Sequence, residues 1–113
     1  MKHFFEVEDI QRQQVGSLKL YLEFLRVAAL SAGLYVLPAG SIDPQKPHKE
    51  DELYYVIRGK ARMRVGTEDR AVSEGSVIFV EASQEHRFYD IEEELEVLVF
   101  FAPAEQEMNP RHQ

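Results

Sequence analysis

Turn-forming residues divide the chain after Pro38 at short and regular intervals. The segments PAGSIDPQKP, IRGK, GTED, SEG and EASQE alternate with short apolar runs. Several strands of this length, separated by clusters of Gly, Pro, Ser and Asp, are typical of an all-β sandwich or barrel. The strands expected in this region are Glu52–Val56, Lys60–Val65, Ser76–Val80, His86–Ile91 and Glu96–Phe101. The acid-rich segment IEEELE at 91–96 is expected to form a solvated hairpin loop between the last two.

The segment ARMRV shows how such a strand sits in the fold. Its apolar residues Ala61, Met63 and Val65 share one face, and Arg62 and Arg64 share the other. A period of two predicts a strand that is buried on one side and solvated on the other.

The N-terminal part of the chain is less regular. Residues 8–15, EDIQRQQV, are readable as a short helix or a turn that ends at Gly16 and Ser17. Residues 18–37 allow a continuous helix from Leu20 to Leu30, since Ala and Leu favour helices, or two strands at Leu20–Val27 and Gly33–Leu37. The all-β pattern of the remaining chain favours the two strands.

Length and composition restrict the class of protein. A chain of 113 residues suits one compact domain, with a polar tail at 104–113 that is expected to fray. The formal net charge of -7 argues against nucleic acid as a partner, because phosphate binding needs a concentrated positive surface. No apolar stretch is long enough for a membrane helix, and the start MKHFFEVEDI does not resemble a signal peptide, so we expect no membrane association and a cytoplasmic location. The absence of cysteine leaves nitrogen and oxygen as metal ligands.

The strongest candidates for chemistry lie around two of the four histidines. His48 and His86 follow turn segments at strand entrances, whereas His3 and His112 lie near the termini. On a strand, the side chains of His48, Glu50, Glu52 and Tyr54 project to one face. With His86 from a neighbouring strand, two histidines and one carboxylate form the ligand set of many non-haem iron(II) oxygenases.

The chain also resembles a known family, the cupins, which are double-stranded β-helix barrels of the jelly-roll type. Their first motif, G-x5-H-x-H-x(3,4)-E-x6-G, matches Gly40, His48, Glu52 and Gly59, with Lys46 in the position of the first histidine.

Their second motif, G-x5-P-x-G-x2-H-x3-N, matches Gly75 and His86, with Glu81, Ser83 and Asp90 in the other positions. The resemblance covers about residues 33–103 and also extends to small cupins labelled mannose-6-phosphate-isomerase-like.

The resemblance implies that His48, Glu52 and His86 bind one divalent ion, such as iron, manganese, nickel or zinc. Lys46 then either extends to the barrel mouth or binds an anionic group of a ligand, and Gln45 either supplies a weak oxygen ligand or caps a turn. Glu50 is a candidate general base, and Tyr54 is a candidate hydroxyl for a ligand in the barrel.

Three functions remain open at this point: a metal-dependent oxygenase or isomerase, a barrel that binds a small metabolite or sugar without turnover, and a barrel without a functional site. In each of the first two the partner is a small molecule. The resemblance further implies a homodimer, for which the apolar run Leu18–Leu30 could supply an edge strand.

Overall fold

The computed structural model describes residues 1–106 and contains a single antiparallel sheet with one helix. The elements are α1 (Val7–Ser17), β1 (Tyr21–Val27), β2 (Leu30–Leu37), β3 (Asp51–Val65), β4 (Glu68–Ser73), β5 (Val77–Val80) and β6 (His86–Ala102). The predicted all-β fold is therefore confirmed. In the same residues, no helix is long and apolar enough to cross a membrane.

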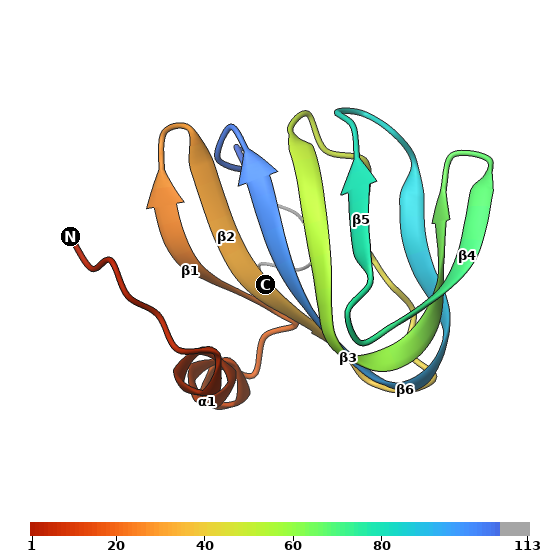
Figure 1. The fold of residues 1–113 in the computed structure, drawn as a ribbon, viewed down its shortest axis with the longest axis horizontal. Coiled ribbons are helices and arrows are strands. Elements are labelled where there is room, and N and C mark those ends of the chain that lie inside the picture. Colours follow the sequence, from red (N-terminus) through yellow and green to blue (C-terminus); the bar gives the residue numbers. More distant parts are fainter. Residues whose placement is uncertain (107–113) are drawn as a thin grey trace.

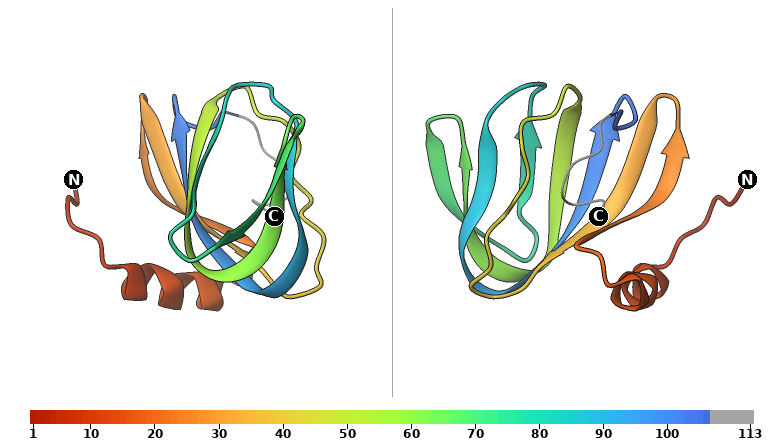
Figure 2. Two further views of the ribbon diagram at one scale, coloured as in Figure 1. Left: turned by 45° about the vertical axis from the view of Figure 1, so that its right-hand side comes forward. Right: turned by 180° about the vertical axis from the view of Figure 1, so that it is seen from behind.

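Two long strands, β3 and β6, give the sheet its barrel shape (Figure 1). They pair with each other along most of their length, while β5 lies beside the first half of β3 and β4 beside its second half. The pairing of β3 with β6 shifts register three times between Val56 and Arg62, around Gly59. Such irregularities bend strands and increase their twist. As a result, the same two strands form part of both walls of the barrel (Figure 2).

This bend corrects two sequence-based expectations. IRGK is not a turn between two strands, and IEEELE is not a hairpin loop, because both segments lie inside the long strands β3 and β6. Their polar side chains instead form ion pairs across the bend, between Arg58 and both Glu94 and Glu96, and between Lys60 and Glu93. The turn-like composition therefore reflects a solvated bend in continuous strands.

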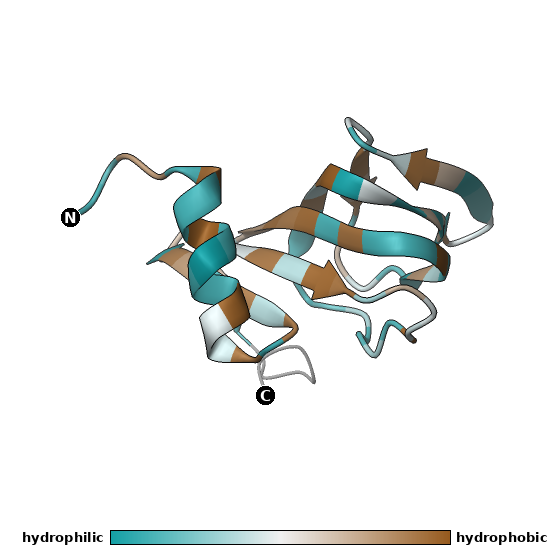
Figure 3. Cartoon of the chain, turned by 90° about the horizontal axis from the view of Figure 1, so that it is seen from below, coloured by the Kyte–Doolittle hydropathy of each residue, from teal (hydrophilic) through white to brown (hydrophobic). Residues whose placement is uncertain are grey.

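The N-terminal half follows the two-strand prediction, and the alternative helix from Leu20 to Leu30 is wrong. β1 and β2 form a hairpin at the edge of the sheet. The segment read as a helix or turn forms α1, which ends where Leu18 adopts a left-handed conformation. Helix α1 buries Ile10 and Gln14 and lies beside the strands, whose residues alternate between apolar and polar (Figure 3).

Apolar side chains fill most of the barrel interior. Tyr35, Tyr54 and Phe101 are fully buried there, with Val97, Val99 and Leu95 of β6 beside them. The predicted fraying of the tail is wrong at its start, because Ala104 and Glu105 are buried. The rest of that prediction concerns residues 107–113, which lie outside the described part of the chain.

Candidate functional site

One end of the barrel interior is polar, because side chains alternate between the inside and the outside of the barrel along residues 48–55. The side chains of His48, Glu50, Glu52 and Tyr54 are all buried, with 4%, 3%, 2% and 0% of each residue exposed. The residues between them are exposed, namely Lys49, Asp51, Leu53 and Tyr55. The period of two therefore places these four candidates inside the barrel, as their common face predicts.

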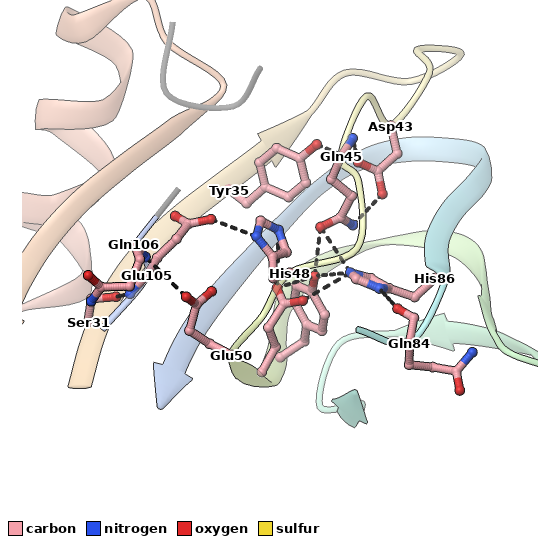
Figure 4. A network of polar contacts seen from close by, with 12 residues as sticks. Ser31, Tyr35, Asp43, Gln45, His48, Glu50, Gln84, His86, Glu105 and Gln106 are labelled. Atoms are coloured by element: carbon pink, nitrogen blue, oxygen red, sulfur yellow. Dashed lines mark hydrogen bonds and ion pairs between the residues drawn. The ribbon is translucent and has the colours of Figure 1, made fainter. Parts of the chain in front are cut away.

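Three of the buried groups meet around the ring of His86, the first residue of β6 (Figure 4). Its Nε2 atom lies 3.1 Å from Glu52 Oε2, 3.1 Å from the Tyr54 hydroxyl and 3.2 Å from Gln45 Oε1. The Tyr54 hydroxyl in turn lies 2.8 Å from both Gln45 Oε1 and Glu52 Oε1. Most of these atoms are hydrogen-bond acceptors, and the tyrosine hydroxyl supplies one proton.

The outer nitrogens of both histidines are held by acceptors. His86 donates its Nδ1–H to the Gln84 carbonyl at 2.8 Å, and the Nδ1 atom of His48 lies 2.9 Å from the buried carboxylate of Glu105. His48 Nε2 lies 3.9 Å from Glu52 Oε1. Such partners fix the orientation of a histidine ring and leave Nε2 available as a ligand atom. Both Nε2 atoms lie beside Glu52.

The pKa of His86 reflects its buried surroundings. Burial is the largest influence and lowers the pKa, but the hydrogen bond and negative charge of Glu52 outweigh it, so the pKa lies above its ordinary value. The Gln84 carbonyl and the charge of Asp43 contribute in the same direction. A positive charge is therefore favoured at this position in the barrel.

Glu105 is a site residue that the sequence analysis assigned to the polar tail. It follows β6 and is held by its backbone, whose N–H donates to Ser31 Oγ at 2.9 Å and whose carbonyl accepts from Arg26 at 2.7 Å. The next N–H, of Gln106, donates to Glu50 Oε2 at 3.2 Å. Glu50 Oε1 is buried and has no hydrogen-bond partner in residues 1–106.

Asp43 is a second residue that the sequence analysis did not single out. It accepts hydrogen bonds from the Tyr35 hydroxyl at 2.5 Å, from the Gln45 side chain at 2.6 Å and from the Phe88 backbone at 3.0 Å. These contacts hold the Gln45 amide so that its oxygen faces His86 and Tyr54. Asp-Pro in SIDPQKP has the composition of a turn, which hides this role in the sequence.

Lys46 does not point into the barrel as His48 does. Its side chain is exposed, and the buried neighbour that reaches His86 is Gln45. Lys46 instead lines a cavity of about 340 Å³ on the barrel surface, together with Arg64 and Arg87.

The residues that replace the glycine and asparagine of the second motif have left-handed backbone conformations. Ser83 and Asp90 have φ angles of 66° and 47°, in the left-handed region that glycine and asparagine favour. Ser83 lies in the turn before His86, and Asp90 lies within β6.

A divalent ion can be tested against this donor set. In residues 1–106, no three histidine or carboxylate side chains are already arranged around a point that would hold a metal. The donor chemistry fits, however, because the two Nε2 atoms and the Glu52 carboxylate are ligands for first-row metals, and amide and hydroxyl oxygens lie beside them. The chemistry of these residues is therefore compatible with a metal ion.

The bent antiparallel sheet and the buried polar cluster at one end define a small β-barrel with an interior site. The family model of the cupin domain matches residues 33–102. The chain belongs to the cupin family, as its two motifs predict.

Known proteins are similar to this chain in sequence or in structure. The uncharacterized protein SCO3923 of Streptomyces coelicolor is 44% identical over 101 residues, which cover 89% of this chain and 96% of that protein. The structure of TT1209 from Thermus thermophilus superposes with a TM-score of 0.73 at 22% identity, over 91% of this chain and 99% of that one.

A second structural neighbour, the DMSP lyase DddQ from Ruegeria pomeroyi DSS-3, superposes with a TM-score of 0.63 at 23% identity. The match covers 67% of this chain and 39% of DddQ, so the chain spans about two fifths of that enzyme. These structures show that the fold is shared.

Proposed function

We propose that the protein binds one divalent metal ion, iron, manganese, nickel or zinc, through His48, Glu52 and His86, and binds a small organic molecule beside it. Gln45 and Tyr54 supply polar oxygen atoms at the same place, and Glu50 supplies a buried carboxylate. A bound ion of this kind supplies a Lewis acid that polarises an oxygen of a small molecule.

The charge of the barrel interior is the observation that carries this proposal. The buried carboxylates at this end are Asp43, Glu50, Glu52 and Glu105, whereas no lysine or arginine is among the buried residues of the described chain. These four carboxylates outnumber the two histidines, His48 and His86, that lie among them. Buried charges are costly unless they are paired or coordinate a metal. A divalent cation carries the charge that this end of the barrel lacks.

The proposal is tested by titrating metal-free, tag-free protein with each of the four ions by calorimetry, alongside the variant His86→Ala. We expect one ion per chain with micromolar or tighter affinity for at least one metal. Loss of an outer partner of a ligand costs about 10–100-fold in affinity, so loss of His86 itself should cost at least about 100-fold.

The variant His3→Ala is the matched control, because it removes an exposed histidine far from the cluster. It should bind metal as the parent does. Binding no tighter than millimolar for all four ions would overturn the metal proposal and favour a barrel that binds a small molecule without metal.

The identity of the bound metal and the presence of turnover separate three classes of function. Iron with consumption of dioxygen favours an oxygenase, whereas manganese, nickel or zinc favours an isomerase. Stabilisation by a small molecule without turnover favours a binding protein. In all three cases the roles of Glu50 as a base and of Tyr54 as a hydroxyl partner are tested by Glu50→Gln and Tyr54→Phe.

We also propose that the protein is a homodimer that pairs through the outer face of β3 and β5. Four large apolar side chains are exposed there, Leu53 and Tyr55 of β3 at 41% each, and Val77 and Phe79 of β5 at 61% and 56%. They are cross-strand neighbours, since Leu53 pairs with Phe79 and Tyr55 with Val77. An apolar patch of this kind on a soluble protein is typical of an interaction surface.

The charges at the ends of this patch favour a second copy as the partner. Asp51 and Glu81 lie at one end and Arg58 at the other, all with exposed side chains. A two-fold axis that sets the strands of two copies antiparallel brings the acidic end of each copy opposite Arg58 of the other, whose guanidinium also pairs with Glu94 and Glu96. The uncharged centre then meets an identical uncharged surface despite the net charge of -7 on each chain.

Phe79→Ser should weaken the dimer at least about tenfold, because aromatic residues in the centre of an interface contribute most to its affinity. Sedimentation velocity over a range of concentrations measures this change. Ile42→Ser is the control, since Ile42 is 82% exposed but lies outside the patch. A parent protein that stays monomeric at high micromolar concentration would exclude the dimer. A dimer insensitive to Phe79→Ser would instead favour pairing through the edge strand β1.

A further inference from the structure

Lys46 is the feature that the metal proposal leaves unexplained. It stands where the first cupin motif has a histidine, yet its side chain is exposed and lines the surface cavity of about 340 Å³ beside His86. The cavity is formed by three separate segments, which contribute Lys46, Arg64 with Gly66, and Glu85 with Arg87. Three cationic side chains and one carboxylate therefore surround it, in a chain whose net charge is -7.

The two arginines of this cavity are held side by side. Arg64 of β3 and Arg87 of β6 are directly opposite each other in the strand pairing. Their guanidinium groups both lie 5.8 Å from the centre of the Tyr89 ring. Like charges directly opposite on neighbouring strands destabilise a sheet. The ring contacts offset part of this cost and fix the position of both groups.

Carboxylates neutralise only part of the positive charge of the three cations around this cavity. Arg64 shares the carboxylate of Asp69, at 3.0 Å, with Arg62 at 3.1 Å. Neither Arg87 nor Lys46 has a carboxylate within 4.0 Å in residues 1–106. Two cations without a carboxylate partner within 4.0 Å in residues 1–106 thus line the same cavity, beside Glu85, as a third that shares its own partner.

We infer that this cavity binds the oxyanion group of a small molecule, a phosphate or a carboxylate, between Lys46, Arg64 and Arg87. Guanidinium groups bind such groups through paired N–H donors, and an ammonium adds a point charge. The position beside His86 connects the anion to the interior cluster, because Gln45 lines the cavity and also contacts His86. The inference deepens the proposed small-molecule function, on which it rests, by naming the ligand as an anion.

Inorganic phosphate is the probe that tests this site. We expect saturable shifts of the Gly66 and Arg87 amide signals in two-dimensional nitrogen–proton spectra of metal-free protein at constant ionic strength. Arg87→Gln and Lys46→Gln should each weaken the affinity about tenfold, the effect of losing one charge-assisted hydrogen bond or ion contact. A parallel titration with malonate distinguishes a preference for phosphate from a preference for carboxylate.

Lys60→Gln is the matched control, because Lys60 is an exposed cation that pairs with Glu93 away from the cavity. Signal shifts that do not saturate with phosphate would show a nonspecific effect of charge and overturn the inference. A loss of phosphate affinity in Lys60→Gln equal to that in Arg87→Gln and Lys46→Gln would do the same. Unchanged affinity in both Arg87→Gln and Lys46→Gln would overturn it as well.

The same spectra separate this inference from the metal proposal. Manganese(II) broadens signals near its binding site, so the parent and His86→Ala are each titrated with manganese(II) and, separately, with phosphate. Phosphate shifts without local manganese broadening support the anion site and count against the metal site. Local manganese broadening without shifts on addition of phosphate or malonate supports the metal site and overturns the anion inference.

Discussion

Gly59→Ala should lower the free energy of unfolding by about 3 kcal/mol or more, which is among the largest effects expected of a single exchange. Gly59 has a φ angle of 107°, which side chains with a Cβ rarely adopt. A Cβ at this position would lie 2.4 Å from the Glu94 carbonyl oxygen and 2.7 Å from the Leu95 Cα. Both contacts are to backbone, so relief requires the bend between β3 and β6 to open.

Gly75→Ala separates the clash from the backbone strain. Gly75 also has a positive φ, 90°, but a Cβ there meets no atom within 4 Å. It should cost only about 1 kcal/mol, the strain of an unfavourable φ. Denaturant unfolding of both variants measures the difference. Equal losses for the two variants would contradict the close approach of the strands at Gly59.

The bend at Gly59 also explains which parts of the fold the sequence could predict. Period-two alternation in ARMRV and in His48–Tyr54 reports the face of each residue, and that information is local. The continuity of β3 and β6 is not local, because it depends on the pairing of the two strands across the bend, which also places Lys60 beside Glu93. A segment with a glycine beside charged residues, such as IRGK, therefore has the composition of a turn even though it lies inside a strand.

The residues of the candidate site also differ in whether the sequence alone could identify them. His48, Glu52 and His86 lie in motifs whose spacing can be read from the chain, and the structure brings them together. Asp43 and Glu105 could not be found by spacing, since each acts through a contact with a distant residue, Asp43 with the Phe88 backbone and Glu105 with His48. The strand β4 was also missed, because EDRAVS has little apolar alternation and depends on pairing with β3.

Glu105→Ala is the second exchange with a large expected effect, and it tests the role of the segment after β6. The Nδ1 atom of His48 lies 2.9 Å from the Glu105 carboxylate, and both side chains are buried. Removing the carboxylate leaves a buried imidazole N–H without this acceptor, which costs about 1–3 kcal/mol of stability. It also frees the ring of His48 to rotate, so the affinity for the proposed metal ion should fall about 10–100-fold.

Glu105→Gln is the matched control for this exchange, because the amide keeps an oxygen that can accept from His48 Nδ1 while the negative charge is lost. We expect the glutamine variant to retain most of the stability and a larger share of the metal affinity than the alanine variant. Thermal unfolding and calorimetric metal titration measure the two quantities. An alanine variant that matches the parent in both would show that His48 is held by its barrel neighbours alone, such as Phe101, whose ring centre lies 5.0 Å away. Equal losses in both variants would assign the effect to the charge of Glu105, and would make this carboxylate part of the electrostatic attraction for the cation.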